Sequence, residues 1–227
     1  MIEIPLWRLS LAFIPMIIVL IYYARLGIAR KNTLIATFRM LLQLSLVGFV
    51  LKFLFTSDNP VLISGFLTLM LAMTSWISLQ SIKEQRRQLY LRALISLATG
   101  CLPTLAIIIF GVLNHTPWYE PKYLIPLAGM IFSNAMNALS LSAERYDKER
   151  AYGHSIEDSR KMALQAALIP LTNTFLAVGI VSFPGMMTGQ ILAGADPLLA
   201  ARYQIMVLAM AFGSAGLSST VYLLKSK

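Results

Sequence analysis

Charged residues are scarce in this chain. Only 13% of its 227 residues are Asp, Glu, Lys or Arg, whereas 57% are hydrophobic, and the mean hydropathy is +0.70. Soluble domains carry roughly 25% charged residues, so the composition excludes an ordinary soluble domain and predicts a membrane protein. The net charge is +9, but the basic residues stand in short clusters between apolar runs. Such clusters are typical of membrane topology signals, and nucleic-acid binding is not expected.

Groups that carry chemistry are also few. Cys101 is the single cysteine and lies in an apolar run, which excludes a disulfide and a cysteine-based metal site. His115 stands on a polar loop near Glu120, which is more typical of a solvated side chain than of a metal ligand. There is no Gly-x-x-x-x-Gly-Lys-Ser/Thr loop and no recognisable meeting of nucleophile and base. We therefore expect that the chain is not an enzyme, binds no cofactor and does not itself hydrolyse ATP.

Apolar runs long enough to cross a bilayer dominate the sequence. A span needs roughly 20 residues, and the runs predict an all-α, polytopic integral membrane protein with a single domain over residues 1–227. The seven expected spans cover residues 5–24, 34–55, 61–79, 93–113, 123–143, 163–192 and 204–224. Most Lys and Arg residues fall in alternate connections, so the positive-inside rule predicts an outer N-terminus and a cytoplasmic C-terminus.

The segment 184–197 is too polar and too rich in glycine for a plain lipid-facing helix. Proline removes a backbone donor and glycine loosens the backbone, so a helix that reaches Pro184 and Gly185 should kink or break. At membrane depth a broken backbone persists only inside protein or beside a watery cavity. We predict a gate or hinge formed by Pro184, Gly185, Gly189, Gly194 and Pro197. The alternative is a kinked helix whose small residues serve close packing.

Uncharged polar residues gather in the fifth and sixth expected spans. Asn134 and Asn137 are three residues apart and share a helix face, and an amide buried in lipid without a partner is costly. We expect a substrate path that also includes Asn173, Met136, Met186, Met187, Thr188 and Gln190. Amide oxygen and thioether sulfur would pass a transition metal without trapping it as Cys or His would. The alternatives are interhelical hydrogen bonds for the polar residues and adaptable packing for the methionines.

The longest polar segment covers residues 144–162 and mixes acidic with basic residues. Mixed signs argue against a polybasic lipid-binding arm. A helix start is expected at Ser155, because an acidic first turn follows it. A cytoplasmic helix joined to a span is a natural docking element, here with Arg150, Gly153, Ser155, Glu157, Asp158 and Arg160. A solvated connection with weak ion pairs is the alternative.

Several blocks of the sequence are recognisable as family motifs. They are LIPLAGMI at 124–131, SNAM at 133–136, ALIP at 167–170, VSFPGMMTGQILAGADP at 181–197 and RYQIMV at 202–207. The pattern Arg39-x-x-x-Gln43-Leu-x-x-Val-Gly48 in the second span belongs with them. These blocks resemble the FetB (YbbM) family of ATP-binding-cassette permeases. The resemblance covers nearly the whole chain, and the Pro-Gly-Met-Met block is specific.

The resemblance implies a multi-pass permease of the bacterial inner membrane that pairs with a separate FetA-like ATPase, which binds the ATP. Bacterial members of the family are assigned to iron export and plant relatives are linked to aluminium tolerance, so the substrate is not uniform. We expect a homodimer that binds two ATPase subunits through residues 145–161, with 81–92 as a secondary contact. The cytoplasmic segment is shorter than the family pattern, and only Gly153 corresponds to its glycine-containing stretch.

The sequence therefore predicts a permease subunit that exports iron or a related metal, driven by a partner ATPase. Three alternatives stay open: a permease for an organic or lipid-like solute, an ATPase-independent secondary metal carrier, and a membrane scaffold that transports nothing. No ionisable residue lies clearly at the middle of a span, which argues against the secondary carrier. The residues do not separate an organic solute from iron.

Overall fold

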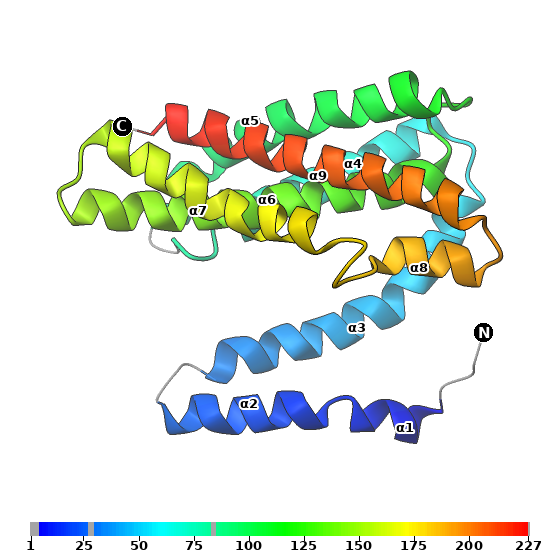
Figure 1. The fold of residues 1–227 in the computed structure, drawn as a ribbon, viewed down its shortest axis with the longest axis horizontal. Helices are drawn as coiled ribbons and strands as arrows, with labels where there is room; N and C mark the ends of the chain where they lie inside the picture. The colour runs from blue at the N-terminus through cyan, green and yellow to red at the C-terminus, as the bar shows by residue number, and fades with distance from the viewer. Residues whose placement is uncertain (1–4, 27–29, 83–84, 227) are drawn as a thin grey trace. The chain divides into compact units, whose positions relative to one another are not determined.

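The computed structural model describes residues 5–26, 30–82 and 85–226, and these residues form helices and connecting turns (Figure 1). The helices are α1 (Leu6–Leu11), α2 (Ile14–Arg25), α3 (Arg30–Phe55), α4 (Pro60–Ser78), α5 (Arg86–Ala106), the π-helix η2 (Ile107–Leu113), α6 (Pro121–Ala151), α7 (Ile156–Ala177), α8 (Gly185–Leu192) and α9 (Pro197–Leu224). Apart from an isolated bridge between Val178 and Ser182, the described residues contain no strand. The predicted all-α fold is confirmed.

Five helices among the described residues are long and apolar enough to cross a bilayer. They are Thr33–Phe55, Pro60–Ser78, Arg86–Leu113, Pro121–Ala151 and Pro197–Leu224, and a shorter apolar stretch covers Trp7–Tyr23. The sixth expected span, 163–192, is divided between α7 and α8. The chain is thus a helical membrane protein with several spans. The count of seven and the orientation remain predictions.

The chain forms two compact units, Met1–Thr56 and Ser57–Lys227. In the first unit α2 and α3 pack against each other, and Thr37 contributes by placing its Oγ1 3.9 Å from the sulfur of Met16. The apolar side chains of α3, such as Phe38, Leu44 and Phe49, are exposed. A helix surface of this kind is suited to lipid or to a neighbouring apolar helix.

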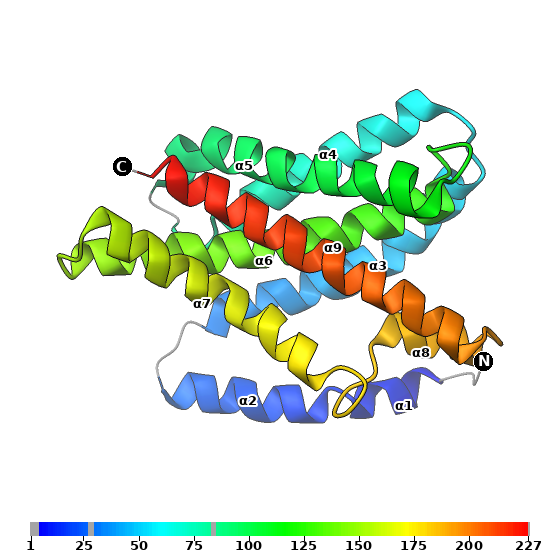
Figure 2. The same cartoon turned by 45° about the horizontal axis from the view of Figure 1, so that its top comes forward.

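The second unit is built around α6 and α9. α9 packs on α5, α6, α7 and α8, and α6 also packs on α4, α5 and α7, so these long helices form one bundle (Figures 1 and 2). The core between them contains the buried side chains of Leu97, Ile131, Leu139 and Met210. This bundle carries every residue that the sequence analysis assigned to a path, a gate or a docking element.

Prolines begin three of the long helices of this unit: Pro60, Pro121 and Pro197. Proline fits the first helical position because its missing N–H would have no partner there. Asp196 caps α9, since its Oδ1 accepts from the backbone N–H groups of Leu198 and Leu199 at 2.9 and 3.1 Å. The chain therefore turns at Asp196 and begins α9 at Pro197.

The polar segment 144–162 is more helical than the sequence suggested. α6 continues to Ala151 and α7 begins at Ile156, so only a short turn separates them. Ion pairs one helical turn apart support the extension, with 2.7 Å between Lys148 and Glu144 and 2.6 Å between Arg145 and Glu149. The helix start expected at Ser155 is confirmed, because its Oγ accepts from the N–H of Asp158 at 3.0 Å.

Helices α5 and α9 approach each other closely at Gly100. A Cβ atom at this position would lie 2.2 Å from Ser218 Oγ and 2.6 Å from the Ser218 backbone nitrogen. Cys101, which is buried, follows it and lies 3.8 Å from the same hydroxyl. Small residues allow helix backbones to approach closely where lipid supplies no hydrophobic driving force. Gly100 therefore fixes the spacing of the two helices.

Gly100→Ala is expected to destabilise the bundle by about 1–3 kcal/mol, the usual cost of overpacking a core. Gly65→Ala on α4 is the matched control, because no atom lies within 4 Å of its new methyl group. That control should be neutral or stabilise by up to roughly 1 kcal/mol, since Ala favours helix over Gly. Thermal unfolding of both variants in detergent makes the comparison. Equal Tm values would contradict the close approach at Gly100.

Candidate functional site

The helix that should form the sixth span is interrupted, as the sequence predicted, but the interruption begins earlier than Pro184. α7 ends at Ala177 and α8 begins at Gly185. Gly179 adopts a φ of 81°, a left-handed conformation that ends a helix readily in glycine. The Ala177 carbonyl accepts from the N–H groups of Val181 and Ser182 at 2.8 and 3.1 Å, and Gly179 donates to Ser182 at 3.0 Å. The loop thus satisfies much of its own backbone.

The interruption begins beside the first half of α9. Phe175 and Val178 line an apolar groove together with Ile205, Leu208 and Ala209 of that helix, which covers Pro197–Leu224. The rings of Phe175 and Phe212 lie 5.3 Å apart, measured between centroids. In both views of the fold, α7 and α8 follow one another along α9 (Figures 1 and 2). A long helix and an interrupted one therefore run together through the same part of the bundle.

The expected hinge residues surround α8. Pro184 is the N-cap of α8 and Gly185 is its first residue, while Gly189 lies inside it. Gly194 has a φ of 96° in the turn that leads to Pro197 at the start of α9. No residue of α8 is buried. The residues that the sequence assigned to a gate therefore lie within and at both ends of a short, weakly packed helix.

The predicted path residues on α8 pack in different ways. Met186 packs against the core, as does Tyr203 of α9. Thr188 is exposed, and its Oγ1 donates to the Pro184 carbonyl at 3.1 Å. Met187 and Gln190 are half-buried. The Oε1 atom of Gln190 is buried and has no hydrogen-bond partner in the described part of the chain.

The other predicted path residues lie on α6 and α7. Asn134 and Met136 are half-buried, whereas Asn137 and Asn173 are exposed. Asn134 donates through Nδ2 to the Met130 carbonyl at 2.8 Å. Ala138 of α6 packs with Ala167 of α7, and the two helices run antiparallel through the short turn that joins them (Figure 2). Asn134 lies four residues before Ala138, and Asn173 lies six residues after Ala167. The two asparagines therefore lie at similar levels along the paired helices.

The path residues thus form two groups, one on α6 and α7 and one on α8. α8 packs mainly on α9, and α9 in turn packs on α6. The apolar groove beside Val178 is lined by none of the predicted path residues. Within the described ranges, no group of three His, Cys, Asp or Glu side chains is placed to hold a metal ion. A metal at this site would meet amide oxygen and thioether sulfur in place of anionic ligands.

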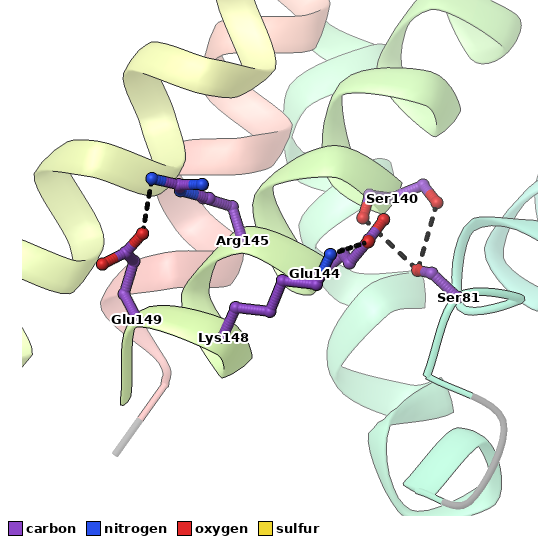
Figure 3. Close-up of polar contacts among 6 residues, drawn as sticks. All are labelled: Ser81, Ser140, Glu144, Arg145, Lys148 and Glu149. Carbon is purple, nitrogen blue, oxygen red and sulfur yellow. Dashed lines mark hydrogen bonds and ion pairs between the residues drawn. The ribbon is translucent and has the colours of Figure 1, made fainter. Parts of the chain in front are cut away.

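At the end of the bundle where α6 meets α7, charged side chains bind one another. Glu149 is buried, at 3% exposure, and contacts Arg145 at 2.6 Å and His154 at 3.3 Å. Arg150 donates to the His154 carbonyl at 2.6 Å. Figure 3 shows that Ser81, in the connection between α4 and α5, reaches α6 at Ser140, with 3.4 Å between the hydroxyls. Ser81, the first residue of the secondary docking segment, therefore contacts α6 at Ser140, one turn before the segment 144–162 begins.

The remaining docking residues divide between the surface and the bundle. Gly153, Ser155, Glu157 and Asp158 are exposed, and Gly153 has a φ of 87°. Arg160 instead turns towards α9. It donates to the carbonyls of Leu223, Leu224 and Ser226, at 3.0, 3.1 and 2.7 Å. One guanidinium thus binds three carbonyls at and just beyond the end of α9, and that of Leu223 also accepts from the backbone N–H of Ser226.

Arg92 of α5 binds the same end of α9. Its Nε donates to the Tyr222 carbonyl at 3.2 Å, and its guanidinium carbon lies 4.1 Å from the centre of the Tyr222 ring. Sequence reasoning placed Arg92 at the end of the secondary docking segment 81–92 and missed Gly179 as the start of the interruption. The only local signal for Gly179 was the glycine itself, which is common just past a helix end but stands here in an apolar run. No local signal pointed to the partners of Arg92.

Comparison with known proteins connects this architecture to a family. The model of the family UPF0014, described as an uncharacterised protein family, matches residues 6–227. The UPF0014 membrane protein slr1647 of Synechocystis is 35% identical over 75% of this chain and 71% of its own. The probable iron export permease protein FetB of Escherichia coli is 31% identical over 94% of this chain and 86% of its own.

The sequence similarity extends to plant proteins. The protein ALUMINUM SENSITIVE 3 of Arabidopsis thaliana is 31% identical over 80% of this chain and 70% of its own length. No solved structure matches the chain. The family match covers α1, the interrupted span and the end of the bundle where α6 meets α7. The chain therefore belongs to the UPF0014 family of membrane proteins.

Proposed function

We propose that the chain is the permease subunit of an ATP-binding-cassette transporter in the bacterial inner membrane, and that it exports iron or a related metal. The observation that carries the proposal is the interruption of a span at 178–184, partway along α9. Secondary transporters bind substrate at discontinuous helices, where the backbone is free of regular helix bonding, and an interrupted span offers an ATP-driven permease the same free backbone groups.

The substrate class rests on similarity and on ligand chemistry. FetB of Escherichia coli, a probable iron export permease protein, aligns with 94% of this chain. The path residues offer amide oxygen from Asn134, Asn137 and Asn173 and thioether sulfur from Met136, Met186 and Met187. Such ligands bind a transition metal weakly enough to release it. Amides also bind organic solutes, so the preference for a metal rests on the similarity to FetB.

Energy comes, in this proposal, from a separate ATPase that docks on the exposed turn 151–158 and binds the ATP. The permease acts as a homodimer with two ATPase subunits. The neighbouring connection at Ser81 adds a second contact, because it lies against the same end of α6. Arg160 links the docking turn to α9. A displacement of the first turn of α7 is therefore passed to α9, on which α8 packs.

The first experiment measures ATP hydrolysis by the cognate ATPase with this chain in proteoliposomes, with and without iron(II) on the ATPase side. Hydrolysis that depends on the chain and rises with iron is the expected result. Hydrolysis that depends on the chain but does not respond to iron would support the permease function and contradict iron as the substrate. Hydrolysis that is independent of the chain, with iron still transported, would favour a secondary carrier.

The double variant Asn134→Leu with Asn137→Leu is expected to reduce iron transport to background, because it removes both amides from the face of α6. Leucine keeps the helix, so assembly should persist. Thr68→Leu on α4 is the control, since it also replaces an exposed polar residue of a span. Iron uptake into inverted vesicles is the measurement. Unchanged uptake in the double variant, with the control also unchanged, would contradict the path.

Arg160→Met is expected to uncouple hydrolysis from transport, since it removes three hydrogen bonds to α9 while keeping the apolar stem. The loss of charged hydrogen bonds at a partly buried site should also cost about 1–3 kcal/mol of stability. Lys161→Met, at the exposed neighbouring position, is the matched control. The ratio of iron transported to ATP hydrolysed is measured for both. A ratio preserved in Arg160→Met would show that the link carries no coupling.

A further inference from the structure

One polar side chain on α9 belongs to none of the groups described so far. Gln204 is buried, at 6% exposure, and its Oε1 atom has no hydrogen-bond partner among the described residues. It lies on the face of α9 that also contains Ala200, Val207 and Ala211, which are buried too. A hydroxyl at such a position can donate back to its own helix, but the longer glutamine amide has no such bond here.

An unpartnered amide in a core is disfavoured, because it loses its hydrogen bonds to water and gains none. Packing alone would favour Leu or Met at this position, and both have nearly the same volume as Gln. The neighbours of Gln204 on its face are apolar, so no structural hydrogen bond accounts for the amide. A polar group kept at a cost to stability is a reason to look for a ligand.

A second unpartnered amide oxygen lies on the helix that packs against this part of α9. Gln190 of α8 also has a buried Oε1 without a partner in the described part of the chain. α8 and α9 are joined by a short turn and pack as an antiparallel pair (Figures 1 and 2). Both oxygens are acceptors, so each can bind a cation or accept from water bound to one.

Gln204 also lies on the helix that connects the two groups of path residues. Ala138 of α6 and Ala215 of α9 pack in one cluster, and the two helices run in the same direction (Figure 1). Counting back from these alanines puts Gln204 about 10 Å beyond Asn134 along the bundle, at 1.5 Å per residue. α9 packs both on α6, which carries Asn134, and on α8, which carries Gln190.

We propose that Gln204 and Gln190 form a cation-binding step of the path, between the interrupted span and the outer turn at 193–196. The ligand class is a divalent transition-metal cation that keeps part of its water shell. The amide oxygens accept hydrogen bonds from that shell or replace a water in it, and no bond is made or broken other than to the metal. This inference rests on the proposed transport of a metal and adds to it a residue outside the predicted path.

The test combines binding and stability in the full chain in nanodiscs. Equilibrium dialysis with cobalt(II), a stable stand-in for iron(II), is carried out on the unaltered chain, Gln204→Met and Ser219→Ala. Ser219 is the matched control because its buried Oγ on α9 also lacks a partner. Removing either unpartnered oxygen should raise Tm by a few degrees. Cobalt affinity should fall about tenfold or more only in Gln204→Met, the usual cost of losing a group that supports a metal.

Cobalt affinity that is equal in Gln204→Met and in the unaltered chain would overturn the inference, as would the absence of cobalt binding in the unaltered chain. If Gln204→Met fails to fold, Gln190→Met takes its place and should lose affinity to a similar extent. Failure of the proposed function has a different outcome. In that case the rate of ATP hydrolysis does not respond to iron, whereas Gln204→Met still binds cobalt more weakly than the unaltered chain.

Discussion

A helix that stops partway across a bilayer must satisfy its own backbone, because no water is present to do so. The loop after α7 meets this constraint locally. The carbonyl of Ala177 accepts from Val181 and Ser182, and the left-handed Gly179 bonds back to Ser182. The tip of the loop can then be apolar, as Ile180 and Val181 are, each more than 80% exposed. The loop therefore needs no fixed partner, and this allows an interruption inside the bundle.

The two ends of the interrupted span differ in how firmly they are held. The first turn of α7 is tied to the end of α9 through Arg160, and α5 is tied to the same end through Arg92. α8 has no buried residue and lies between the loop at 178–184 and the turn that contains Gly194. We therefore expect a force applied where α6 meets α7 to move α7 and α9 together, with a shift of α8 as the easiest response.

Apolar periodicity and capping chemistry predict most of the fold, because they act locally. The long spans, the cap at Ser155 and the corner at Asp196 all follow from nearest neighbours in the chain. The start of the interruption does not follow from neighbouring residues, because the segment 178–181 is as apolar as the helix before it. Burial of Gln204 depends on how α9 is rotated against α5 and α6, which tertiary packing decides. The inward turn of Arg160 depends in the same way on a contact with residues far along the chain.

Polar residues within the spans are of two physical kinds, and composition does not separate them. Hydroxyls such as those of Ser75, Ser96 and Thr104 donate to a carbonyl of their own helix, so they are satisfied wherever the helix lies. The amide oxygens of Gln190 and Gln204 are left without a partner in the described residues, as is the hydroxyl of Ser219, and the two amides are the longer and more polar of these groups. The methionines divide similarly, because Met206 and Met210 are core packing. A functional argument for this bundle therefore rests on its amides more than on its hydroxyls or on its number of methionines.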